Sequence, residues 1–504
     1  MLQPYDFPPG IYANGTDLEA EGRWRDGNLV RWYNGHLRPV GGWQRFTASP
    51  LPGTPRALFT WRQNNSTPRL AIGTEGNLFI HDGSLAYDIT PVGLVAGSTD
   101  GNYGLGFGAG NYGAEEYGNQ RSATGLSLDA TIWDLDSWGQ DLMALSPADG
   151  RIWHWVAPAT GTKAVIVDAT APTQNRGMFV TDERFLVALG ANGDARNITW
   201  CSQEDYTQWT ASDTNSAGSL QLQTNGQVMN ARKMPGEALI FTDTDVHQLQ
   251  YIGVPFVYSL RRIGTNCGLI GRKAHIANNS IAAWMGTRNF YVYDGATVQT
   301  LPCDVQEYVY DDLNMQQGSK VVAGVNALFN EFWWMYPSAS SIENDTIVIW
   351  NYRENWWSYA KLARVGWTDK EVWPYPMAGA PDGNLYQHED GWTDSNDPRI
   401  GTIFATTGPF DIGGGDRMFD ANQLIPDTNI GGPESLVFSF TTKLTPGDAA
   451  PRSFGPYADN RGDGYVDIRI SGRQATMTVT NATDGLFQVG QYRMDIMPTP
   501  GARR

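Results

Sequence analysis

One short pattern returns along this 504-residue chain: a strand of aromatic and branched residues that adjoins Asp-Gly or a similar turn. Such side chains favour a pleated, half-buried surface, and Asp-Gly supplies the positive φ that a tight hairpin turn needs. The pattern occurs at residues 76–83, 149–155, 287–295 and 382–391. Hairpins that recur in this way build a radial stack of small sheets around a channel, so the sequence predicts a β-propeller.

The propeller is expected between residues 51 and 400, as about six or seven blades of uneven spacing. Within it, residues 331–336 and 346–352 are continuous apolar runs, which predict adjacent strands that are buried on both faces. No long amphipathic helix pattern interrupts the series, so the fold class is all-β. The expected blades lie at 55–95, 125–168, 178–220, 225–265, 275–312, 320–362 and 375–400.

The two ends of the chain differ from this central stretch. Residues 1–50 are rich in turns, whereas residues 401–504 contain longer strands with alternating apolar and polar side chains, such as 436–441 and 466–471. Alternation of this kind is typical of a sheet with one face in solvent. We therefore expect an N-terminal platform segment 1–50, the propeller 51–400 and a C-terminal domain 401–504, with the chain ends forming a β-sandwich-like platform.

Charge and cysteine content exclude several classes of protein. The formal net charge is -17, so the chain lacks the basic footprint of a nucleic-acid-binding protein. Its 3 cysteines form no C-x-x-C pair, so we expect no disulfide framework, and a reducing site of synthesis fits. The first 15 residues lack the pattern of a signal peptide, and no apolar run of about 18 residues predicts a membrane helix.

Motifs for catalysis or metal binding fail on context and spacing. Residues 108–113 match G-x-G-x-x-G by letter but lie in a glycine-tyrosine repeat. Residues 134–139 begin like a calcium loop, yet Trp138 occupies a ligand position, so Asp134 and Asp136 are interpreted as turn and surface acids. The histidines show no zinc spacing, and a nucleophile elbow is missing. We expect no enzyme, no cofactor and no metal. Three histidines in similar repeat positions are expected to be structural: His81, His154 and His388.

An insertion at 97–121 interrupts the blades and repeats Tyr-Gly. Two interpretations stay open: a surface loop, or a contact loop that orders against a neighbouring subunit. The proline-interrupted tail 498–500 cannot continue a strand ladder and is expected to dock on a neighbour or an adaptor. The candidate contact residues are Tyr103, Tyr112, Tyr117, Arg503 and Arg504.

Both ends of the chain resemble one family. They are similar to tail nozzle proteins of short-tailed bacteriophages, also called tail tubular or packaged-DNA stabilisation proteins. The similar residues are 9–12, 22–32, Gly35 and 38–43 near the start, and 470–474 and 490–495 near the end. The resemblance implies a hexameric ring below the portal and adaptor, a propeller in each subunit and a channel through which the genome leaves. It implies a place in the virion tail after synthesis in the host bacterial cytoplasm, with tail fibres or a spike as further partners.

The acidic charge fits such a channel, because acidic walls repel DNA phosphates and let duplex DNA pass without specific binding. The sequence therefore predicts a predominantly acidic ring lumen. The alternative function is a carbohydrate-binding or carbohydrate-degrading phage tail protein, in which tryptophans stack on sugars. The lumen candidates lie in expected blade-edge loops: Asp243, Asp245, Asp311 and Asp312.

Overall fold

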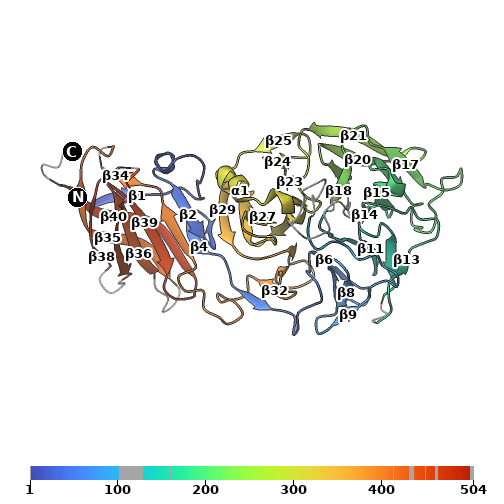
Figure 1. The fold of residues 1–504 in the computed structure, drawn as a ribbon, viewed down its shortest axis with the longest axis horizontal. Helices are drawn as coiled ribbons and strands as arrows, with labels where there is room; N and C mark the ends of the chain where they lie inside the picture. Colours follow the sequence, from blue (N-terminus) through green and yellow to red (C-terminus); the bar gives the residue numbers. More distant parts are fainter. Residues whose placement is uncertain are drawn as a thin grey trace, which may run out of the picture.

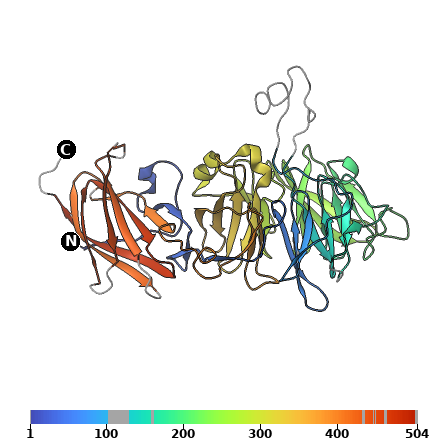
Figure 2. The same ribbon diagram turned by 60° about the horizontal axis from the view of Figure 1, so that its bottom comes forward.

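The computed structural model consists of two bodies that lie side by side along the long axis (Figure 1). Its described residues form seven four-stranded antiparallel sheets in one body and two six-stranded sheets in the other. The two bodies are also separate in the turned view of Figure 2. The smaller body there contains strands from both ends of the chain. The structure describes residues 2–101, 129–157, 161–412, 414–430, 436–445, 447–448, 450–459 and 464–499.

Each four-stranded sheet is one blade of a propeller, and seven blades confirm the predicted architecture. Blade 1 contains β6 (Ala57–Arg62), β7 (Pro68–Gly73), β8 (Leu78–His81) and β9 (Ala86–Asp88). Blade 2 contains β10 (Asp134–Trp138), β11 (Asp141–Leu145), β12 (Ile152–Trp155) and β13 (Val165–Ile166). Blade 3 contains β14 (Gly177–Val180), β15 (Leu186–Leu189), β16 (Asn197–Trp200) and β17 (Gly218–Gln221). Blade 4 contains β18 (Val228–Met234), β19 (Glu237–Thr242), β20 (Asp245–Gly253) and β21 (Val257–Thr265).

The remaining blades follow in chain order, except for one strand. Blade 5 contains β22 (His275–Ala277), β23 (Ala282–Met285), β24 (Phe290–Tyr293) and β25 (Val298–Leu301). Blade 6 contains β26 (Val322–Asn326), β27 (Glu331–Tyr336), β28 (Thr346–Asn351) and β29 (Trp356–Lys361). Blade 7 contains β30 (Gly366–Thr368), β31 (Met377–Gly379), β32 (Leu385–His388) and, from the N-terminal segment, β5 (Trp43–Arg45).

The first strands of the blades close a ring. Each contacts the next in the order β6, β10, β14, β18, β22, β26, β30 and back to β6. Strand β5 completes the last blade by pairing with β32, with Trp43 opposite His388 and Arg45 opposite Tyr386. A segment that precedes blade 1 therefore fastens blade 7, and the predicted platform segment 1–50 contains one propeller strand.

Apolar runs give blade 6 its buried core. Strands β27 and β28 are buried along their whole length and pair in register, with Trp334 opposite Val348. This pairing confirms that the two apolar runs are adjacent strands. Aromatic side chains fill both faces of the blade, because neighbouring blades cover it on each side. The fully buried tryptophans here are Trp333, Trp334, Trp356 and Trp357.

The second body is a β-sandwich in which each of the two sheets contains strands from both ends of the chain. In one sheet the order is β3-β4-β40-β35-β38, with β1 paired to β40, and in the other it is β2-β33-β39-β36-β37, with β34 paired to β39. The first sheet contains β1 (Leu2–Tyr5), β3 (Val30–Tyr33), β4 (His36–Pro39), β35 (Phe419–Ile430), β38 (Val466–Gly472) and β40 (Phe487–Pro498). The second contains β2 (Trp24–Asn28), β33 (Phe404–Thr407), β34 (Phe410–Asp411), β36 (Leu436–Lys443), β37 (Arg452–Ala458) and β39 (Gln474–Asn481).

Helical segments are short. None of the helices in the described part of the chain has the length and apolarity needed to cross a membrane. They are α1 (Gln306–Asp312), η1 (Asp17–Ala20), η2 (Ala191–Gly193) and η3 (Met315–Lys320).

Candidate functional site

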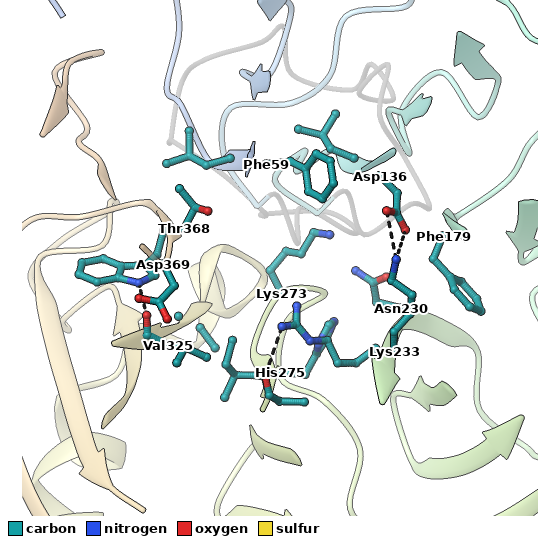
Figure 3. Close-up of a pocket in the computed structure, with 18 of the residues that line it drawn as sticks. Phe59, Asp136, Phe179, Asn230, Lys233, Lys273, His275, Val325, Thr368 and Asp369 are labelled. Atoms are coloured by element: carbon teal, nitrogen blue, oxygen red, sulfur yellow. Dashed lines mark hydrogen bonds and ion pairs between the residues drawn. The ribbon is translucent and has the colours of Figure 1, made fainter. Parts of the chain in front are cut away.

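The first strands of the blades surround a central cavity of about 740 Å³ (Figure 3). Lining residues near the beginnings of these strands, such as Asp134 and Asn230, are buried, whereas lining residues just past the strand ends are exposed, namely Asp182, Pro235 and Asn279. The cavity therefore opens where the strands end. Its volume lies within the range of small-molecule sites, which is about 300–1,000 Å³.

Asp134 is a buried acceptor that joins four blades. One carboxylate oxygen accepts from the Met178 backbone N–H at 3.2 Å and from Arg272 Nη2 at 2.9 Å. The other accepts from Asn230 Nδ2 at 3.0 Å and from Lys273 Nζ at 2.5 Å. Burial alone would raise the pKa of Asp134, but Lys273 and Arg272 hold it below its usual range. Because these groups come from blades 2 to 5, the carboxylate links blades that are not neighbours.

Asp136, two residues further along β10, also connects blade 2 to other blades. It accepts from the Val180 backbone N–H at 2.9 Å. It also accepts from Lys233 Nζ at 3.0 Å (Figure 3). The prediction that Asp134 and Asp136 are turn and surface acids is wrong. Both lie on an inner strand whose alternate side chains point at cations and backbone N–H groups of other blades.

The wall formed by blades 4 and 5 is rich in cations. Arg232 Nη2 donates to the Ala277 carbonyl at 3.3 Å, and Lys273 reaches the Asp134 carboxylate. Burial, together with Arg232, Lys273 and Arg272, holds the pKa of His275 well below its usual range, so this imidazole is neutral.

Acids occupy the opposite side. Asp369 accepts from the Ala327 backbone N–H at 3.3 Å, and burial raises its pKa. Glu371 follows it on the connection after β30, and Asp182 lies beyond the end of β14. The cavity thus has cations on blades 4 and 5 and carboxylates on blades 2, 3 and 7.

A second buried charge cluster joins the sandwich to the propeller. Arg31 on β3 is 1 % exposed and reaches Glu331 of blade 6 at 2.9 Å and Glu389 of blade 7 at 2.6 Å. Trp333 Nε1 donates to Glu331 at 2.8 Å, and the Phe329 ring lies 3.7 Å from the guanidinium carbon. Burial, which outweighs Arg31, raises the pKa of Glu331 to about 7.

Aromatic and polar contacts surround this cluster. Strands β2 and β3 pack on β29, the outer strand of blade 6. Trp32 meets Trp356 edge to face at 5.6 Å, and the Tyr359 hydroxyl donates to Asp26 at 2.7 Å. The sandwich is thus fixed to blades 6 and 7 by a desolvated ion cluster, next to an aromatic contact with the outer strand of blade 6.

The four acids predicted for a lumen do not line the propeller cavity. Asp243 is exposed in the turn before β20, and Asp245 is buried, accepting from the Thr224 hydroxyl at 2.8 Å. Asp311 and Asp312 lie on α1, where Asp312 pairs with Lys361 at 3.0 Å. Their place in a ring lumen stays a prediction.

The predicted contact residues lie outside the described part of the chain: Tyr103, Tyr112, Tyr117, Arg503 and Arg504. The root of the insertion is described. Asp100 accepts from the fully buried Lys320 at 2.6 Å, and Gly101 exchanges hydrogen bonds with Gln317. The insertion therefore begins at η3, beside blade 6.

The histidines singled out by the sequence have partners inside their blades. His81 Nδ1 accepts from the Gly83 backbone N–H, His154 contacts Asp141 at 3.1 Å, and Arg364 Nε donates to His388 at 2.7 Å. Among the described residues, no group of three or more His, Cys, Asp or Glu side chains is placed to hold a metal ion. The cysteines are all buried and form no disulfide: Cys201, Cys267 and Cys303.

Ring topology and a charged central cavity define a seven-bladed β-propeller that carries a sandwich. No family model matches the chain, and no curated protein matches it. Solved structures that are similar to it include the following two. A structure described as YCF48 bound to D1 peptide has a TM-score of 0.38 and 10 % identity, covering 69 % of this chain and 97 % of that one. The Pan2 WD40 domain of Neurospora crassa has a TM-score of 0.39 and 10 % identity, covering 71 % and 98 %.

Proposed function

We propose that this chain is a non-enzymatic structural subunit of the tail nozzle of a short-tailed bacteriophage. Six copies form a ring below the portal and adaptor that retains and then conducts the genome. The observation that carries the proposal is the sandwich, which both chain ends build and which is fixed outside the propeller ring. A subunit with two firmly joined bodies offers different surfaces to its two neighbours, and such heterologous contacts form a ring when the rotation between subunits closes.

An exposed apolar hairpin tip supports assembly. Strands β20 and β21 are nine residues each, and the turn between them exposes Val254 at 80 % and Phe256 at 75 %, beside the half-exposed Ile252. The base of the hairpin is fixed, because Tyr258 is buried against Phe185. Contiguous exposed apolar side chains on a firm base are typical of protein interaction sites.

The DNA path in this proposal is the lumen of the ring. Asp134 and the cations of blade 5 are joined across the propeller channel, so single side chains cross it. A duplex whose major groove alone is about 12 Å wide does not fit through such a channel. We propose acidic lumen walls, with Asp243, Asp245, Asp311 and Asp312 as candidates, and the adaptor, the portal and tail fibres or a spike as partners.

The alternative is a carbohydrate-binding or carbohydrate-degrading tail protein. Stacking on sugars needs exposed tryptophan faces. Of the 19 tryptophans, all but Trp373 and Trp392 are buried. Burial of nearly all these rings favours the structural role, and a glycan array with Trp373→Ala and Trp392→Ala variants tests the alternative.

Electron microscopy of virions and of the purified chain tests the nozzle. We expect a sixfold ring at the tail, and placement of three copies at a fibre tip would contradict it. A double variant, Val254→Ser with Phe256→Ser, should reduce ring formation while the monomer keeps its circular dichroism spectrum. The matched control is Leu85→Ser, which changes a side chain 61 % exposed at another blade edge. If the double variant and the Leu85→Ser control assemble equally well, the hairpin is not part of the ring interface.

A further inference from the structure

Arg232 lies in the wall of the central cavity and has no ion-pair partner among the described residues. It donates one hydrogen bond, to the Ala277 carbonyl at 3.3 Å, and no carboxylate in the described part of the chain lies at ion-pair distance from it. Its neighbours differ: Lys233 pairs with Asp136, and Lys273 pairs with Asp134. Arg232 thus has hydrogen-bond donors that no acceptor in the described part of the chain uses.

Positive charge exceeds negative charge on this wall. Burial is the main cause of the lowered pKa of His275, and Arg232, Lys273 and Arg272 lower it further, so all three cations lie close to this imidazole. The Asp134 carboxylate forms ion pairs with Arg272 and Lys273 but not with Arg232. Desolvation lowers the pKa of Arg232 itself, and Glu371 and Asp136 oppose this at longer range. Arg232 is partly buried, and an anion beside it would offset the cost of that partial desolvation.

We propose that the central cavity binds a small oxyanion, the carboxylate or phosphate group of a compact molecule, through Arg232. The planar guanidinium offers two parallel N–H groups that match the oxygens of either anion. The cavity of about 740 Å³ holds a molecule of metabolite size. This site is separate from the ring contacts and the lumen of the proposed function.

The opposite wall limits the size and charge of the ligand. Asp369 and Glu371 on blade 7 and Asp182 at the mouth repel a second negative charge that reaches across the cavity. The site therefore selects a compact ligand with one anionic end. A polyanion such as tripolyphosphate must approach these three acids and binds no better than phosphate.

Calorimetric titration of the full chain with sodium phosphate and, separately, with sodium acetate tests the site at constant ionic strength. We expect saturable binding of at least one anion, and the stronger of the two identifies a phosphate or a carboxylate ligand. Arg232→Gln should weaken binding about tenfold or more, because it removes a charge-assisted hydrogen-bond donor. The control Arg261→Gln removes an exposed arginine from β21 of the same blade and should bind like the unaltered chain.

Three results would overturn the proposal: binding of neither anion, unchanged binding by Arg232→Gln, or tighter binding of tripolyphosphate than of phosphate. A crystal structure of the unaltered chain with the bound anion is a second measurement that needs no variant, which matters if Arg232→Gln does not fold. Density for the anion within hydrogen-bond distance of Arg232 supports the site. Density confined to the outer surface of the molecule refutes it.

Discussion

Replacing Arg31 with Met should destabilise the protein strongly and in a pH-dependent way. The guanidinium makes hydrogen bonds or ion pairs with two buried carboxylates, Glu331 and Glu389, and Met keeps much of its volume without the charge. Removal of one partner from a buried ion cluster costs about 3–5 kcal/mol, because the remaining charges stay desolvated. We expect a loss of that size in the free energy of unfolding at pH 8, measured by urea titration with tryptophan fluorescence.

The pH dependence follows from Glu331. Its pKa is raised from 4.5 to about 7 in the folded protein, so the folded state holds a proton that the unfolded state releases. The stabilising contribution of this proton is complete below pH 4.5 and is lost as the pH rises through 7, an effect of about 3 kcal/mol. In the Arg31→Met variant Glu331 lacks its cation, so the decline extends to higher pH. The loss relative to the unaltered protein should be smaller at pH 5 than at pH 8.

Two further variants complete the test. Arg353→Met makes the same chemical change in the exposed turn between β28 and β29 and should alter stability by no more than about 0.5 kcal/mol. Glu331→Gln should flatten the stability profile between pH 5 and pH 8. If Arg31→Met loses no more stability than Arg353→Met, or loses the same amount at both pH values, the ion-cluster argument is wrong.

Three other outcomes are expected. Asp134→Asn leaves Arg272 and Lys273 without their carboxylate, so it should lower the free energy of unfolding in urea titrations by about 3–5 kcal/mol. A smaller loss of stability than that caused by Asp136→Asn would contradict the link between four blades. Trp43→Ala removes a buried ring from the strand that closes blade 7, at a cost of about 3–5 kcal/mol, and limited proteolysis should show faster cleavage near the closure. Burial raises the pKa of every cysteine thiol, so a thiol reagent at pH 8 should modify none in the native protein and all 3 in urea; rapid native modification would refute this.

Strand positions were the most predictable part of the fold. Residues 331–336 and 346–352 read as adjacent strands because their apolar runs are long and continuous, and the structure pairs them. Strand β5 could not be found in this way. It has three residues, Trp43, Gln44 and Arg45, and its hydrogen-bond partner β32 lies more than 300 residues further along the chain.

The charged sites were harder to predict, since their members are far apart in sequence. Asp134 looks like a turn acid next to Asp136, and the cation Arg272 that explains its burial lies 138 positions away. Arg31 and Glu331 are separated by 300 positions. A local pattern shows which side chains share a strand face, but it does not show which strand from another blade faces them.

Because β5 completes blade 7, blade 7 cannot close during synthesis until β32 has been made. Trp43 leaves the ribosome 345 residues before His388, its partner across the strand pair. At about 5–20 residues per second, the N-terminal strands wait roughly 20–70 s for their partners. During that time the aromatic rings of Trp24, Trp32 and Trp43 have no sandwich or blade to cover them. The first strands made are thus among the last to be buried.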